Sequence, residues 1–195
     1  MCASRRTKAR CPGVPVSVKT RIGVKSIVTE DWIGFLLGQH LQAITVHGRT
    51  AKELSKVPNH WDEIGKAVKL RDQHAPETVM IGNGDILNQE QAQNAHTMYG
   101  VDGVMIGTGI FQNPWVFEKM PGNHTSRESL DLLLKHAKLF ADTYPGERRF
   151  AAMRKYFKMY VRSFPGATTL MKQLMETKGF SEVEHRVLTT GQRYI

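Results

Sequence analysis

Short runs of apolar and β-branched residues recur four times in the first 110 residues, and each run ends in a polar or glycine-rich cluster. The runs are VPVSVKTR (14–21), AITVHGRT (43–50), TVMIGNGD (78–85) and DGVMIGTG (102–109). Their starts lie 29, 35 and 24 residues apart, and a helix-length segment follows each of them. This spacing predicts consecutive strand–helix units of a parallel sheet.

Helix signals between these runs support the same interpretation. Thr29 is expected to cap the first helix, and Asn59 or His60 to open the second. Asn88 is expected to cap a third helix that ends at Gly100, a residue suited to the left-handed position after a helix. A further short helix is expected around residues 111–117.

Polar side chains gather where the predicted strands end. They are Lys19, Arg21, His47, Arg49, Asn83, Asp85 and the glycines at 107 and 109. The strand C-termini form the active-site face of a (β/α)8 barrel, which needs eight such units and about 250 residues. This chain has room for four units before its pattern changes. We therefore predict an α/β domain over residues 14–121, the second half of a TIM barrel, preceded by an irregular basic N-terminus (1–13).

After Pro121-Gly122 only helical periodicity remains. One apolar stripe recurs in 130–141, a second in 153–161 and a third in 170–175, with a further helix expected over 181–188. The sequence thus predicts a small all-α helical bundle domain over residues 123–195.

The charge balance adds a candidate partner. The net charge is +9 and the pI is near 9.7. Residues 147–172 carry seven Lys or Arg against one acid, Glu147. On the second stripe, Arg154, Lys155, Lys158 and Arg162 are expected to face outward, with the last three aligned at helical spacing. Such a face is typical of a polyanion-binding surface, and a solvated basic surface is the alternative.

Other features narrow the class of protein. Two cysteines, Cys2 and Cys11, make no disulfide framework. No apolar run approaches the roughly 20 residues of a membrane helix, the N-terminus has no apolar signal segment, and no metal-ligand motif is expected. A cytoplasmic protein without a membrane partner is the resulting expectation.

The strand ends also suggest chemistry. The segments Gly82–Asp85 and Gly107–Gly109 follow adjacent strands, and their backbone amides could cradle a phosphate, although glycines also serve tight turns. Lys19 offers a cation at a strand end, where a solvated side chain is the alternative. His47 could contact a ligand ring or could be a hydrogen-bonded core histidine. Four consecutive polar strand ends together favour a ligand site.

The combination VPVSVKTRIG (14–23), ITVHGRT (44–50), MIGNGDI (80–86) and DGVMIGTGIFQNPWVF (102–117) closely resembles the tRNA-dihydrouridine synthases. The segment RRFAAMRKYFKMYVRSFPGATTLMKQL, within residues 147–175, resembles their helical domain. The resemblance implies an FMN-dependent (β/α)8 barrel that uses NADPH and reduces the C5=C6 bond of a uridine in tRNA. A cysteine of the family acts as general acid.

The resemblance also implies roles for individual residues. Lys19 would approach the flavin ring and His47 would lie against it. Asn83, Gly84 and Asp85 would border the FMN, and Gly107 with Thr108 would hold its phosphate. Arg21 and Arg49 match positions that face a uridine or a tRNA phosphate.

Two departures from the family pattern stand out. The family's catalytic cysteine belongs to a loop upstream of the segment matching 14–21, so we do not assign Cys11 to that role and name no catalytic residue. Thr108 stands where the family usually has arginine, which replaces a bidentate phosphate partner with a neutral hydroxyl.

The leading interpretation is therefore a fragment of a tRNA-dihydrouridine synthase. Its half-barrel would need a complementary half or self-association to cover the open sheet edges. A non-catalytic tRNA-binding protein derived from the family is one alternative. Another FMN-dependent barrel oxidoreductase, acting on a small molecule, is a second.

Overall fold

The computed structural model describes residues 13–118 and 122–190, and the chain divides into two compact units, Met1–Ile110 and Phe111–Ile195. Each unit is described by itself. We expected the first unit to run to residue 121, but the segment from Phe111 groups with the second. The reason is local packing, because the ring of Phe111 stacks on Tyr156 with centroids 5.8 Å apart. The basic N-terminus predicted over 1–13 lies outside the described residues except for Gly13.

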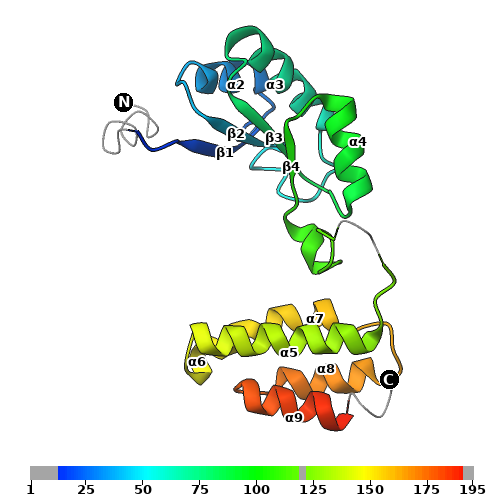
Figure 1. Cartoon of the computed structure of the whole chain (residues 1–195). Helices are drawn as coiled ribbons and strands as arrows, with labels where there is room; N and C mark the ends of the chain where they lie inside the picture. The colour runs from blue at the N-terminus through cyan, green and yellow to red at the C-terminus, as the bar shows by residue number, and fades with distance from the viewer. Residues whose placement is uncertain (1–12, 119–121, 191–195) are drawn as a thin grey trace. The chain divides into compact units, whose positions relative to one another are not determined.

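The first unit contains one parallel four-stranded sheet (Figure 1). Its strands are β1 (Ser17–Arg21), β2 (Ala43–His47), β3 (Val79–Asn83) and β4 (Gly103–Met105). They pair in sequence order, β1-β2-β3-β4, and every pair is parallel. The α/β parallel architecture predicted from the four runs is confirmed. The β1 strand begins three residues later than its run, beyond Val14 and Pro15, and proline cannot donate a ladder hydrogen bond.

Three helices connect these strands, α2 (Thr29–Leu37), α3 (Trp61–His74) and α4 (Gln89–Tyr99). Right-handed crossovers between neighbouring parallel strands place such helices on one face of the sheet. The core that joins helices and sheet includes Ile33 of α2, Ile64 of α3, Ile44 and Val46 of β2, and Met80 of β3, all of them buried.

Two of the three predicted helix signals are confirmed. The Asn88 side chain accepts a hydrogen bond from the amide of Gln91, and Gly100 ends α4 with φ of 70°. His60 precedes α3 as its cap residue. The cap assigned to Thr29 is wrong. Thr29 is instead the first helical residue of α2, and its hydroxyl donates to Glu63 Oε2 at 2.5 Å, which ties α2 to α3.

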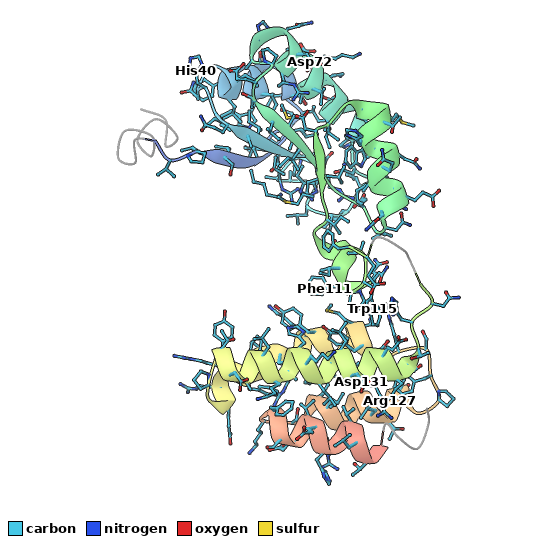
Figure 2. The ribbon with its side chains drawn as sticks, in the orientation of Figure 1. His40, Asp72, Phe111, Trp115, Arg127 and Asp131 are labelled. Atoms are coloured by element: carbon cyan, nitrogen blue, oxygen red, sulfur yellow. The ribbon has the colours of Figure 1, made fainter. Side chains whose placement is uncertain are left out.

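The second unit contains only helices among its described elements. They are α5 (Ser126–Thr143), α6 (Glu147–Phe150), η2 (Ala151–Tyr156), α7 (Phe157–Tyr160), α8 (Ala167–Met175) and α9 (Phe180–Thr190), and η1 (Thr108–Phe111) leads into the unit. Helix α5 packs against α7 and α9, and α8 packs against α9. On the outer surface of α5, Arg127 and Asp131 lie one turn apart and form an ion pair of 3.4 Å (Figure 2). No helix in the described part of the chain is long and apolar enough to cross a membrane.

The stripe predicted over 153–161 is not one continuous helix. It is divided into η2 and α7. Met153 and Phe157 are buried and Tyr156 is half-buried, so the predicted stripe still faces inward. Arg162 follows the end of α7, so it does not continue a helical row with Lys155 and Lys158 as predicted.

Candidate functional site

The ends of all four strands line a single pocket of about 460 Å³ in the first unit. The pocket contains every residue that the sequence assigned to the strand-end site: Lys19, Arg21, His47, Arg49, Asn83, Gly84, Asp85, Gly107 and Thr108. Sheet register explains this convergence. Arg21 pairs with His47, His47 with Asn83, and Asn83 with Met105, so four last-row positions share one face of the sheet.

Asn83 is fixed by the strand next to it. The side-chain Nδ2 donates to the carbonyl oxygen of Met105 at 2.8 Å, and the residue is 7% exposed. This bond orients the amide across the end of β4. The carbonyl side of the amide is therefore held in a set orientation at the pocket.

Arg49 and Asp85 form the tightest ion pair of the pocket. Nη1 and Nη2 of Arg49 donate to the two carboxylate oxygens at 2.8 and 2.5 Å, and Nε donates to the Val57 carbonyl at 2.7 Å. The Arg49 side chain is 7% exposed and that of Asp85 is 48% exposed. Three N–H groups of the guanidinium are thus bound by the protein and its charge is paired, so Arg49 orients Asp85 rather than presenting a free cation to a ligand phosphate.

Two cations remain for a ligand. Nη1 of Arg21 donates to the carbonyls of Thr50 and Leu54 at 2.9 and 3.1 Å, which anchors the side chain beside the pocket. Within residues 13–118 and 122–190, neither Lys19 nor Arg21 forms a salt bridge. Because the Arg49 charge is balanced by Asp85, the pocket keeps a net positive charge that suits an anionic ligand.

The same charges act on His47. Burial, followed by the positive charges of Arg21, Lys19 and Arg49, lowers the pKa of His47 to about 4, against a smaller opposing effect of Asp85. Burial and the Arg21 charge also lower the pKa of Lys19. At neutral pH His47 is a neutral imidazole that can donate one hydrogen bond and accept one. In this state it does not carry the second ring proton that an imidazolium could donate.

The glycines in the loops after β3 and β4 differ in whether packing requires a residue without a side chain. A Cβ on Gly84, whose φ is 131°, would lie 2.1 Å from Asn59 Oδ1, and a Cβ on Gly109 would lie 2.3 Å from the Ile86 carbonyl oxygen. These two are required by packing. A Cβ on Gly107 would meet only Asn83 Nδ2, at 3.9 Å, so packing does not require glycine there. A side chain at 107 would project into free space at the pocket.

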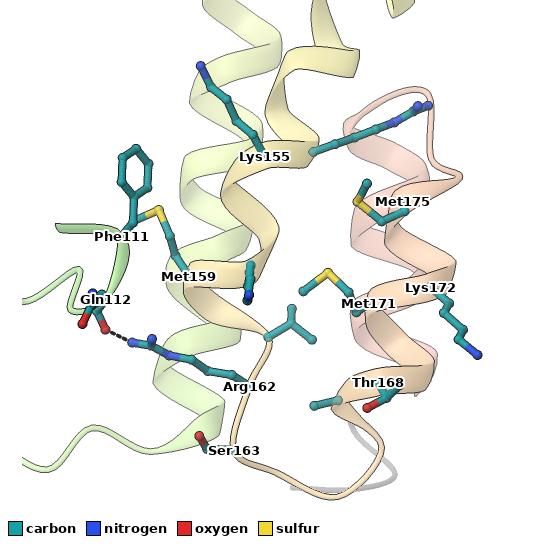
Figure 3. Close-up of a pocket in the computed structure, with 14 residues that line it drawn as sticks. Phe111, Gln112, Lys155, Met159, Arg162, Ser163, Thr168, Met171, Lys172 and Met175 are labelled. Carbon is teal, nitrogen blue, oxygen red and sulfur yellow. Dashed lines mark hydrogen bonds between the residues drawn. The ribbon is translucent and has the colours of Figure 1, made fainter. Parts of the chain in front are cut away.

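A second site lies in the helical unit. A groove of about 890 Å³ runs between the η2–α7 segment and α8, and all four predicted basic residues line it: Arg154, Lys155, Lys158 and Arg162 (Figure 3). Three of these side chains are exposed as predicted. Arg154 is half-buried, because its Nη2 donates to the Thr177 carbonyl at 3.1 Å beyond the end of α8. Its outward orientation was predicted wrongly.

Several lining residues were not predicted. In the pocket they are Leu54, Ser55, Ile86 and Met105, and in the groove they include Phe111, Met171 and Met175. Leu54 has φ of 54°, a rare conformation that no helix or strand pattern indicates. Met171 and Met175 are spaced at i and i+4 on one helix, a signal that could have been read as a second apolar face of α8. Cys11 lies outside the described residues.

Comparison with known proteins gives the family. The family described as dihydrouridine synthase (Dus) matches residues 5–193. The chain is 46% identical over 172 residues to a probable tRNA-dihydrouridine synthase of Staphylococcus aureus, which covers 87% of this chain and 52% of that protein. It is 44% identical over 190 residues to probable tRNA-dihydrouridine synthase 2 of Bacillus subtilis, which covers 96% of this chain and 58% of that protein.

These matches set both an identity and a limit. The chain spans about half the length of the curated relatives it matches. The resemblance inferred from the four strand-end motifs is confirmed, because the family match and the two relatives each cover most of this chain. The chain belongs to the dihydrouridine synthase family.

Proposed function

We propose that this chain acts as part of a tRNA-dihydrouridine synthase, in which the C5=C6 bond of a uridine in tRNA is reduced with FMN as cofactor and NADPH as electron donor. The observation that carries this proposal is the convergence of four strand ends on one positively charged pocket. When bound, FMN supplies the hydride for uridine reduction. The sheet is proposed to form half of a (β/α)8 barrel, and the helical unit to bind tRNA.

The residues of the pocket fit an anionic flavin nucleotide. Gly107 has free space beside it, which a ligand group could occupy and which a side chain at position 107 would fill. Lys19 and Arg21 supply positive charge, and the lowered pKa of Lys19 means that a nearby anion would relieve an unfavourable burial of its ammonium. We propose that Gly107 and Thr108 border the phosphate, while Lys19 lies near the ring.

Three further residues are proposed to orient the bound groups. His47, neutral because its pKa is about 4, would act as a hydrogen-bond partner beside the ring. Asn83 would border the same group with the amide that Met105 orients. Arg49 would act as a positioning residue, holding Asp85 next to Gly84 at the pocket edge.

No residue of this chain is assigned as the general acid. The resemblance implies that the family cysteine lies in a loop upstream of the segment that matches residues 14–21, and we propose that a complementary half-barrel supplies it. General acid catalysis typically contributes 10²–10⁴-fold. The chain alone should therefore form dihydrouridine at least about a hundredfold more slowly than a complete relative.

The test is an assay of dihydrouridine in tRNA by mass spectrometry after incubation of the purified chain with FMN, NADPH and unmodified tRNA. Addition of the part of the Bacillus subtilis relative that this chain does not match should raise the yield. Robust conversion by the chain alone, or no rise on addition of that part with flavin bound, would contradict the proposal.

A second candidate function has its own support. The groove of the helical unit collects cations independently of the strand-end pocket, which suits a tRNA-binding protein without redox chemistry. Flavin absorbance of the purified chain separates the two candidates. A small-molecule FMN oxidoreductase would bind flavin but would not bind tRNA. We also propose a cytoplasmic location, because the proposed substrate is tRNA.

A further inference from the structure

The groove between η2–α7 and α8 has an apolar interior as well as a basic rim. Val161, Ala167, Met171 and Met175 line it, and Figure 3 shows the side chains of Met171 and Met175 pointing into the space between the two helical segments. Met175 is 45% exposed although it is a large apolar residue. A row of cations that follows a phosphate backbone does not need such a surface.

The rim of the groove carries uncompensated positive charge. Lys155, Lys158, Arg162 and Lys172 are all exposed and line the groove, and no carboxylate from residues 13–118 or 122–190 lines it. Across the residues that the structure describes, none of these four forms a salt bridge. Arg162 donates from Nη2 to the Gln112 carbonyl, which fixes its side chain at one end of the groove (Figure 3).

We propose that this groove seats one unstacked nucleotide of an RNA, with its base against Met171 and Met175 and its flanking phosphates on the lysines and Arg162. The proposal rests on the proposed tRNA substrate and adds a base-binding subsite to it. Thioether sulfurs make favourable contacts with aromatic rings and adapt to rings of different shape. A base presents such a ring next to a negative charge, and the groove volume lies within the usual range of ligand sites.

The size of the expected effect follows from the contact type. Sulfur–aromatic contacts are favourable but individually weak. Removal of one base from a bound RNA, with its phosphates kept, should therefore weaken binding about threefold to tenfold. Loss of a cation should instead weaken the binding of both RNAs, with and without that base, to the same extent. The reason is that phosphate contacts do not depend on the base.

The experiment uses the full chain and two fluorescein-labelled RNAs, a five-uridine RNA and the same RNA with an abasic central nucleotide. Fluorescence anisotropy should show about threefold to tenfold tighter binding of the complete RNA. In the double variant Met171→Gln/Met175→Gln this difference should vanish, while affinity for the abasic RNA stays unchanged. The variant Met171→Leu/Met175→Leu should retain most of the difference, because it keeps the apolar surface.

The matched control is Met98→Gln, which changes a methionine that is 72% exposed on α4, outside the groove. It should bind both RNAs as the unmodified chain does. Equal affinity for the two RNAs in the unmodified chain would overturn the proposal. The proposal would also be overturned if an acidic amphipathic peptide displaced the labelled RNA at a lower concentration than unlabelled five-uridine RNA does. The groove would then be a protein-binding site.

These outcomes are separate from those of the proposed enzyme. The readout is binding of a short RNA, so an absence of dihydrouridine formation would leave a base-dependent affinity intact. Conversely, if the unmodified chain bound the two RNAs equally but took part in flavin-dependent activity, the nucleotide seat would be rejected and the proposed function would stand.

Discussion

Arg49 illustrates how single residues set the charge of the pocket. Its guanidinium makes three hydrogen bonds within the protein, two of them to Asp85. The pairing is asymmetric, since the arginine side chain is 7% exposed and the carboxylate 48%. Removal of the carboxylate would leave a buried cation, whereas the carboxylate itself has access to water.

Asp85→Ala should therefore destabilise the chain by about 2–3 kcal/mol, which is below the usual cost of a fully buried pair because Asp85 is half exposed. Urea denaturation measures the change. The matched control is Asp72→Ala. Asp72 also pairs with a buried arginine, Arg71, but that arginine keeps a second carboxylate partner, Asp102. The control should cost less than about 1 kcal/mol, and an equal loss in both variants would contradict this account.

The pKa of His47 gives the stability a pH dependence. Its folded value, about 4, lies below the ordinary value of 6.5. Above pH 6.5 the imidazole is neutral whether the chain is folded or not, so it adds no pH dependence there. Between pH 6.5 and 4 the unfolded chain takes up a proton that the folded chain does not, and stability is lost as the pH falls.

His47→Gln should reduce this loss by about 1 kcal/mol between pH 7 and 4.5, a figure lowered from the full shift to allow for solvent screening. The measurement is the free energy of unfolding in urea at each pH. His185→Gln makes the same change at an exposed position on α9 and is the control for the substitution itself. Parallel profiles for His47→Gln and the unmodified chain would reject the role of burial at this site.

Thr108 lies at the mouth of the same pocket and is exposed. If position 108 meets the FMN phosphate as proposed, Thr108→Arg should tighten FMN binding by about 1.5–3 kcal/mol, because a charge-assisted contact would replace a neutral one. Quenching of flavin fluorescence gives the affinity. Thr108→Gln adds length without charge and should change the affinity little. If the arginine and glutamine variants bind FMN equally, position 108 does not meet the phosphate.

At the scale of elements, helix α3 sets the position of β3. Trp61 donates from Nε1 to the Gly84 carbonyl at 3.1 Å and stacks on Tyr99 with centroids 5.5 Å apart. It is held on both sides and lies against Gly82, where a Cβ would come within 2.5 Å of the indole ring. The close approach of helix to strand fixes the end of β3, from which Asn83 enters the pocket.

Gly82→Ala should consequently destabilise the chain by about 1–3 kcal/mol, since the indole ring has little freedom to move. Gly103→Ala on the neighbouring β4 is the control, because a Cβ there meets nothing within 4 Å. The control should be neutral or slightly stabilising, given the poor strand preference of glycine. Thermal unfolding of the two variants decides, and similar melting temperatures would argue against a tight α3–β3 contact.

The elements also show what the sequence could predict. Runs of apolar and β-branched residues at regular spacing predicted the four parallel strands, and register then brought their end residues together without further information. The role of Arg49 was not predictable, because its partner Asp85 lies 36 residues away and only the folded pairing shows that its charge is balanced. Arg154 was misplaced for a similar reason, since its partner Thr177 lies beyond the end of α8.

At the scale of the whole chain, the net charge of +9 raises the question of whether RNA binding would depend on particular residues or on charge alone. The helical unit allows a direct comparison. Five cations line the groove, and Lys155, Lys158 and Arg162 are three of its exposed ones, whereas α5 carries three exposed cations outside it. Of these, Arg127 and Lys138 are paired with carboxylates on the same helix.

The triple variant Lys155→Ala/Lys158→Ala/Arg162→Ala should weaken tRNA binding and flatten the dependence of log affinity on log salt by roughly two to three units. The slope changes because fewer phosphate contacts form, so fewer counterions are released on binding. Its helix content by circular dichroism should stay the same, since these side chains are exposed. The control, Arg127→Ala/Lys135→Ala/Lys138→Ala, removes the same net charge from α5. It should lower affinity slightly through long-range attraction but keep most of the salt slope. Equal slopes for the two triple variants would show that tRNA responds to the overall charge of the chain and not to the groove.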